Sequence, residues 1–246
     1  MITRYLFISV VALIPQDNHA PVVKIQSPAA NMTASTGSSI SYEITVADQE
    51  DGDSRYDEIN PKEVVLMIRA AGMSKSAAPT SPIDPLKDPG LATMARSNCF
   101  NCHQFNGRLI GPSLAGIARR YGRFTAAITD SLTRRIKDGS TGIWGKEKMP
   151  SHPEVGTGDI RAMLRWIEKY AAAPGVTYQN GTSGVLQFPA PEPASGSVPE
   201  PSTAGATAAA RPGIYTLTAA YTDHGTKDTK TGPYLTGLDQ LTFIVK

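Results

Sequence analysis

The chain has 246 residues, enough for one large domain or two small ones. Apolar residues make up 40% of it and charged residues 19%, so a packed core is possible and wholesale disorder is excluded. A net charge of +2 argues against a dedicated nucleic-acid-binding protein. No apolar run approaches the roughly 20 residues that cross a bilayer, so no transmembrane segment is expected in the mature chain. Two cysteines are too few for a disulfide-stapled scaffold or an all-cysteine zinc site, which needs about four thiolates.

The charge is unevenly divided along the chain. Residues 74–175 hold 15 Lys and Arg against 8 Asp and Glu, a net of +7. Residues 1–73 hold 5 against 9, a net of −4, and residues 176–246 hold 4 against 5, a net of −1. A basic middle between acidic flanks indicates that the middle is a separate domain.

The first 18 residues have the pattern of an export signal. Arg4 precedes a ten-residue apolar run, YLFISVVALI, and a polar stretch follows. A signal at residues 1–18 predicts a periplasmic or secreted protein, although Asn18-His19-Ala20 is a poor cleavage site. The alternative is a buried strand or a fragment of a longer precursor.

Residues 19–73 are predicted to form the first part of a β-sandwich. Ile40, Tyr42, Ile44 and Val46 alternate with polar residues, which is the period-2 pattern of a half-buried strand. Further strands are expected at residues 22–25 and 64–68.

Residues 85–173 are predicted to be helical. Ile128, Leu132 and Ile136 form one apolar stripe. A second stripe runs from Ile160 to Ile167 at the spacing i, i+3, i+4, i+7. Amphipathic helices of this kind surround an apolar centre.

Residues 176–210 are expected to be a linker, because the stretch from 189 onward is rich in Pro, Ala, Ser and Gly. Residues 211–246 return to a strand pattern and are predicted to be the last strands of the sandwich. The two β segments have about 55 and 35 residues, and a single immunoglobulin-like sandwich needs roughly 100. One sandwich split by the helical domain is therefore favoured over two separate β modules.

Residues 99–103 read Cys99-Phe100-Asn101-Cys102-His103, the spacing of c-type haem attachment. Two thiols one turn apart can add to the two vinyl groups of a haem, and the imidazole of His103 can reach the iron from the same face. One covalently bound haem c, with its iron, is the expected cofactor.

Met149 is the candidate for the second axial ligand that a low-spin electron carrier needs. It lies 46 residues after His103, and Pro150 keeps it out of a helical conformation. A thioether suits iron and raises its reduction potential. The Pro112 carbonyl is expected to accept the free ring N–H of His103, and the Trp144 indole to reach a haem propionate.

These motifs make residues 85–173 resemble a small bacterial class I cytochrome c. The resemblance is carried by MARSNCFNCHQFNGRLIGPSL, RRIKDGSTGIWGKEKMP and GDIRAMLRWIEKY. It implies an all-α fold whose first and last helices cross. It also implies that Cys99 and Cys102 are the thioether positions, His103 the proximal ligand and Met149 the distal ligand.

The flanking segments resemble a polycystic-kidney-disease-type, immunoglobulin-like β-sandwich. The matching stretches are NHAPVVKIQSPAA, ITVADQEDGD and NPKEVVLMIRA before the helices, and PGIYTLTAAYTDHG and LDQLTFIVK after them. The expected fold class is thus multidomain α and β, with an all-α cytochrome c domain inserted in, or flanked by, an immunoglobulin-like sandwich.

Several alternatives for the site stay open. CxxC is also the spacing of a redox dithiol, which needs an α/β context, and a structural zinc site would need two further ligands. Met149 is otherwise a core methionine or a simple loop residue, and His152, three residues later, is an alternative distal ligand. The acidic run at residues 48–58 is either a Ca²⁺ site or a solvated loop.

The function indicated is one-electron transfer by a haem with His/Met ligation, and not an enzymatic activity. Redox partner proteins with an acidic docking face are expected, because the helical segment carries many basic residues. These are Arg119, Arg120, Arg123, Arg134, Arg135, Lys146 and Lys148. One alternative, implied by the resemblance, is an electron-accepting subunit or domain of a secreted or periplasmic quinone-dependent sugar or alcohol dehydrogenase system. A second is a haem sensor with an open iron site, if Met149 does not ligate.

Overall fold

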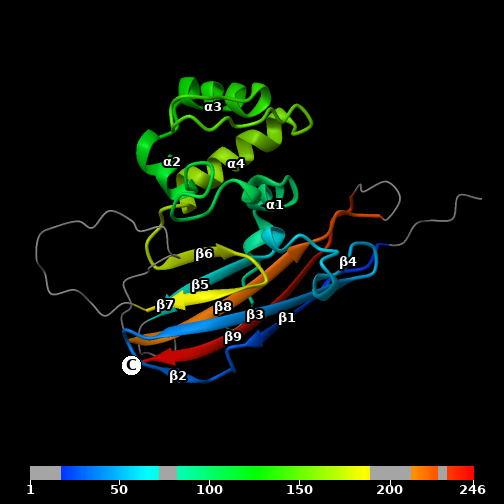
Figure 1. Cartoon of the computed structure of the whole chain (residues 1–246), viewed down its shortest axis with the longest axis vertical. Helices are drawn as coiled ribbons and strands as arrows, with labels where there is room; N and C mark the ends of the chain where they lie inside the picture. Colours follow the sequence, from blue (N-terminus) through cyan, green and yellow to red (C-terminus); the bar gives the residue numbers. More distant parts are fainter. Residues whose placement is uncertain (1–17, 72–81, 189–211, 227–231) are drawn as a thin grey trace, which may run out of the picture.

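The computed structural model describes residues 18–71, 82–188, 212–226 and 232–246. Four helices lie at one end of the molecule and two β-sheets at the other (Figure 1). The predicted export signal, apart from its last residue, and residues 189–210 of the predicted linker lie outside the described residues.

The first sheet, sheet A, is built around one long central strand, β3 (Ser39–Asp48). It pairs antiparallel with β1 (Val22–Ser27) on one side and with β4 (Gly52–Asp53) and β7 (Ser183–Gln187) on the other. The predicted alternation is confirmed, since Ile40, Tyr42, Ile44 and Val46 are all buried.

The second sheet, sheet B, has the strand order β2-β9-β8-β5-β6. Its strands are β2 (Thr33–Ala34), β9 (Thr236–Val245), β8 (Gly213–Thr222), β5 (Val65–Ala71) and β6 (Val176–Asn180). All its pairings are antiparallel except that of β2 with β9. Strands from before and after the helices are thus hydrogen-bonded in one sheet, and the two sheets bury a common apolar core between them.

The predicted linker at residues 176–210 is wrong over its first part. Residues 176–180 and 183–187 form β6 and β7, and β6 belongs to sheet B whereas β7 belongs to sheet A. Gly181, at a φ of 133°, lies where the chain passes from one sheet to the other. Five-residue strands carry little periodicity of their own, and these two are held by β5 and β3, which are more than 100 residues away in the chain.

The helical part contains α1 (Pro89–Arg96), α2 (Leu114–Tyr121), α3 (Ala126–Asp138) and α4 (Thr157–Tyr170). Side chains of Asp88, Ser113 and Thr125 cap the first three helices. Helices α1 and α4 cross, as the resemblance implies. Only glycine fits at position 90 in this crossing, because a Cβ there would collide with the carbonyl oxygen of Ala162. None of the helices in the described part of the chain has both the length and the hydrophobicity to span a bilayer.

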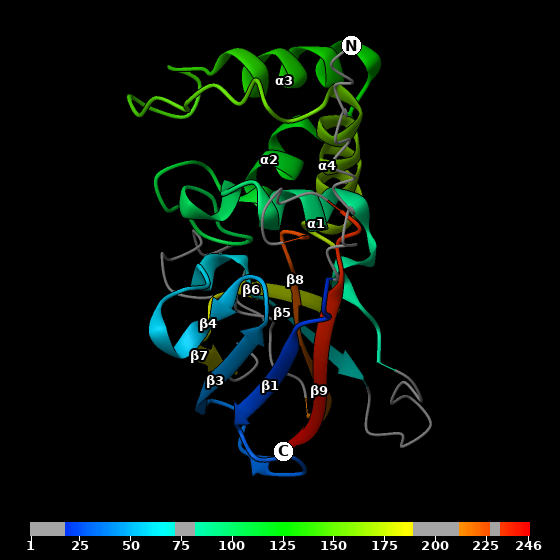
Figure 2. The same ribbon diagram turned by 90° about the vertical axis from the view of Figure 1, so that its right-hand side faces the viewer.

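Sheet B is covered on both faces. Leu66 and Ile68 of β5 face the core between the sheets, whereas Val65 and Ala220 belong to the apolar cluster of the helices. Both views show α1 lying between the sheets and the remaining helices (Figures 1 and 2). The helical part and sheet B therefore share one hydrophobic core.

Candidate functional site

The helical part encloses a cavity of about 310 Å³, within the size range of cofactor pockets. Its walls include Cys99, Cys102, His103 and Met149, so residues 46 positions apart in the chain meet at one site. The remaining lining is largely apolar and includes Met94, Leu114, Leu132, Leu164 and Ile167.

The CxxCH segment follows α1 in a tight turn. Asn98 takes a left-handed conformation at a φ of 57°, which asparagine tolerates better than most residues, and the short 3₁₀ helix η5 (Cys99–Asn101) follows. The backbone N–H groups of Cys102 and His103 both donate to the carbonyl oxygen of Cys99, at 3.2 and 2.9 Å. Cysteines and histidine are thereby held as one compact unit.

The imidazole of His103 is fixed by the loop that follows it. Its Nδ1–H donates to the carbonyl oxygen of Pro112 at 2.7 Å. A carbonyl only accepts, so this bond assigns the proton to Nδ1 and leaves the Nε2 lone pair available as a metal ligand. Burial lowers the pKa of His103, with the bond to Pro112 opposing the shift, so the ring is neutral at pH 7.

Gly111 packs flat against the same ring. A Cβ at this position would lie 2.6 Å from the Cε1 atom of His103, a distance at which Cβ atoms essentially never occur in proteins. This role of Gly111 could not be predicted from the sequence. A Gly-Pro pair signals a turn, but it does not reveal which side chain the turn will contact.

The thiol of Cys99 does not have the property of a reactive redox cysteine. Both cysteines are free, and burial raises the pKa of Cys99 to about 12. A reactive dithiol needs a cysteine whose pKa is lowered toward neutrality. In the described part of the chain, helix α1 and not a strand leads into the motif, whereas a redox dithiol of the thioredoxin type follows a strand.

Met149 is clamped to the end of α3. Its N–H donates to the carbonyl oxygen of Ser140 at 2.9 Å, and its own carbonyl oxygen accepts from the Ser140 N–H at 3.1 Å. Gly139, at a φ of 78°, ends α3 and leaves room for this contact. The loop between Ser140 and Met149 therefore closes on itself, and Met149 is placed in the cavity wall. The role of Ser140 could not be predicted from the sequence, because the contact is made by backbone atoms and does not depend on the type of residue.

Trp144 and His152 also line the cavity. The Trp144 ring lies under the guanidinium of Arg120, with 4.7 Å from the Arg120 Cζ atom to the ring centroid. The Nδ1 atom of His152 lies 2.9 Å from the Glu154 carboxylate. The place of His152 three residues after Met149 keeps it open as an alternative ligand.

The acidic run is engaged in local contacts. Asp48 Oδ1 accepts the N–H groups of Glu50 and Asp51, and Asp53 pairs with Arg55. Across the described ranges, no group of three or more His, Cys, Asp or Glu side chains is arranged to hold a metal ion. The described residues therefore provide no set of ligands for the zinc or calcium site considered above.

The donors present fit a covalently bound haem. Two free thiols and a neutral imidazole lie on one wall, a thioether lies on another, and the apolar lining suits a porphyrin. The fold and the cavity thus define a c-type haem protein.

Comparison with known proteins agrees. The family model for cytochrome c matches residues 89–171. Over 72 residues, 29% of this chain and 69% of the relative, the chain is 39% identical to cytochrome c-552 of Nitrosomonas europaea. It is 34% identical over 77 residues to cytochrome c-551 of Allochromatium vinosum, covering 31% of this chain and 81% of that protein. The crystal structure of the Nitrosomonas europaea cytochrome c552 aligns at 34% identity over 31% of this chain and 93% of that one, with a TM-score of 0.29.

The chain belongs to the cytochrome c family through this domain. Its cofactor is a covalently bound c-type haem with iron. Cytochromes c are electron-transfer proteins that act on redox partner proteins. The two sheets fall outside the matched residues.

Proposed function

We propose that the chain is a one-electron carrier in which His103 and Met149 are the axial ligands and Cys99 and Cys102 the attachment points. The observation that carries this proposal is the meeting of these four side chains around one apolar cavity. The haem supplies the one-electron chemistry, because its iron alternates between the ferrous and ferric states.

The residues of the chain hold and tune this centre. Pro112 and Gly111 orient the His103 ring, and Ser140 holds the Met149 segment by its backbone. The apolar lining excludes water, which favours the ferrous state and a higher reduction potential. With both axial positions taken by side chains, no substrate has to bind.

The rim of the cavity supports docking of an acidic redox partner. Ile110 and Ile143 line the cavity and are 48% and 36% exposed. Arg108 and Lys148 also belong to the lining and are exposed, and so is Glu147, the single acidic residue among the described lining residues. A small apolar patch with basic neighbours suits a transient, electrostatically steered interface with an acidic protein.

We also propose a periplasmic or secreted location, supported by the export-signal pattern at residues 1–18 and by the bacterial relatives. The two-sheet part is proposed to be an immunoglobulin-like sandwich of the polycystic-kidney-disease type. Its two facing sheets, largely antiparallel, support this assignment.

The ligand assignment is tested by the optical spectra of the oxidised wild-type protein and of the variants Met149→Ala and His152→Ala. Wild type and His152→Ala should show the weak charge-transfer band of a methionine sulfur bound to ferric iron. Met149→Ala should lose the band, keep its haem and bind cyanide readily. A wild-type protein without the band, or a Met149→Ala variant that retains it, contradicts the assignment.

A further inference from the structure

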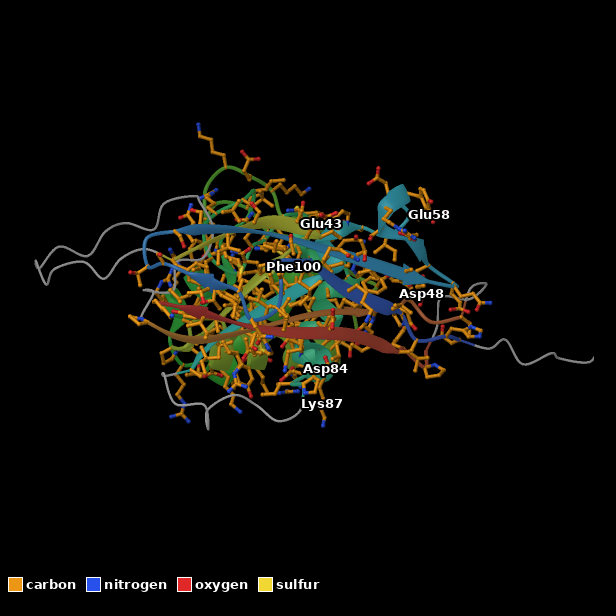
Figure 3. The ribbon with its side chains drawn as sticks, turned by 90° about the horizontal axis from the view of Figure 1, so that it is seen from below. Glu43, Asp48, Glu58, Asp84, Lys87 and Phe100 are labelled. Carbon is orange, nitrogen blue, oxygen red and sulfur yellow. The ribbon has the colours of Figure 1, made fainter. Side chains whose placement is uncertain are left out.

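The two residues between Cys99 and Cys102 are linked to the β-sandwich, Asn101 directly and Phe100 through Phe105. The first, Phe100, is 1% exposed and packs on Phe105, with 4.7 Å between ring centroids. Phe105 packs in turn on Tyr178 of β6, at 5.3 Å. Seen from below, the label of Phe100 falls near the middle of the molecule (Figure 3).

The second residue, Asn101, is held by a hydrogen bond. The Nδ2 of Asn60, just before the 3₁₀ helix η2 (Pro61–Glu63), donates to its Oδ1 at 3.2 Å. The Oδ1 atom of Asn60 accepts the backbone N–H of Lys62. This bond fixes the orientation of the Asn60 amide, so that its Nδ2 group faces Asn101.

Tyr178 ties three segments together. It sits on β6, where its backbone pairs with Met67 of β5. Its ring also meets Trp166 of α4 edge-on, with 5.2 Å between centroids. Phe105 and Trp166 are both only 2% exposed. The Tyr178 ring, which comes from sheet B, packs on both of them and so helps to bury the core of the helices.

We infer that the β-sandwich positions the haem-attachment segment, with Tyr178 and Asn60 as positioning residues for His103. The link is the turn itself. The N–H groups of Cys102 and His103 bond to the Cys99 carbonyl across Phe100 and Asn101, so a shift of either intervening residue moves the histidine. The sandwich therefore contacts the residues that hold His103 in place and is not an appended module.

The inference rests on the proposed role of Cys99 to His103, and the test separates the two. Backbone hydrogen exchange of the segment 99–103 and the reduction potential are measured for wild type, Tyr178→Ala, Tyr178→Phe and Asn60→Asp. The last variant keeps the oxygen that caps η2 and removes the donor to Asn101. It also places a carboxylate beside Glu63, which the Asn60 side chain contacts, so its result is compared with that of Tyr178→Ala. Tyr42→Ala is the matched control, because Tyr42 is buried between the sheets, away from the helices.

Tyr178→Ala should speed exchange of the segment by about tenfold or more and lower the potential, because the packing behind Phe105 is lost and water enters. Asn60→Asp should change both in the same direction, by less. Tyr178→Phe should keep the wild-type exchange rate and reduction potential. Tyr42→Ala should leave the exchange rate and the potential unchanged while it lowers the melting temperature. Unchanged exchange and potential in Tyr178→Ala and Asn60→Asp, or equal changes in Tyr42→Ala, would overturn the inference. If no haem were attached, hydrogen exchange of residues 99–103 would still show whether the β-sandwich holds this segment in place.

Discussion

Gly111→Ala is the substitution whose effect on the site follows most directly from the geometry. The new Cβ would lie 2.6, 2.9 and 3.0 Å from Cε1, Nδ1 and Nε2 of His103, whereas ordinary van der Waals contact begins at 3.4 Å. The ring or the loop must therefore move by about 0.4 Å to clear 3.0 Å, and by about 0.8 Å to reach ordinary contact. Either shift strains the 2.7 Å hydrogen bond from Nδ1 to the Pro112 carbonyl. Overpacking of this kind costs about 1–3 kcal/mol.

Guanidinium unfolding of the haem-loaded protein measures this cost. The same substitution at Gly158 is the control, because nothing lies within 4 Å of the Cβ there and the residue is in helix α4. Gly158→Ala should be neutral or stabilise by up to about 1 kcal/mol, through helix propensity. Gly111→Ala should unfold at lower denaturant and show a shifted haem spectrum. Equal midpoints for wild type and Gly111→Ala would refute the packing of Gly111 on His103.

Three further outcomes are expected. His103→Ala should abolish stable haem loading, as measured by the ratio of haem to protein absorbance; a normal spectrum would refute the proximal assignment. Gly90→Ala should force α1 away from α4 and lower the free energy of unfolding by about 1–3 kcal/mol in a denaturant titration, and an unchanged midpoint would contradict the crossing. Burial raises the pKa of Tyr178 to about 12 from 10.0, so the folded protein holds this proton more tightly than the unfolded chain. The free energy of unfolding should therefore fall as pH rises from 10 toward 12, and Tyr178→Phe should flatten the fall; identical profiles would show that Tyr178 is not buried in this way.

The covalently bound haem could be predicted from sequence, and Met149 proposed as a ligand, because both rest on short, local signals. CxxCH has a fixed spacing, Met149 precedes a proline, and the stripes on α3 and α4 repeat at helical period. The same holds for β3, where ten residues are enough for alternation to be visible.

The contacts that join the two parts could not be predicted, because they depend on register between distant segments. Tyr178 lies in a five-residue strand without clear alternation, and it meets Phe105 only because β6 pairs with β5. Asn60 precedes a proline and therefore indicates only a turn. For the same reason, the start of the predicted linker is wrong at residues 176–187.

The central claim is tested most directly by optical spectra of protein exported to the periplasm, recorded oxidised and reduced, before and after acid-acetone extraction. The account predicts haem that stays with the polypeptide, sharp absorption bands in the reduced protein, and the methionine-to-iron charge-transfer band in the oxidised protein. Haem that is extracted by the solvent would contradict attachment at Cys99 and Cys102. Attached haem without the charge-transfer band would contradict ligation by Met149.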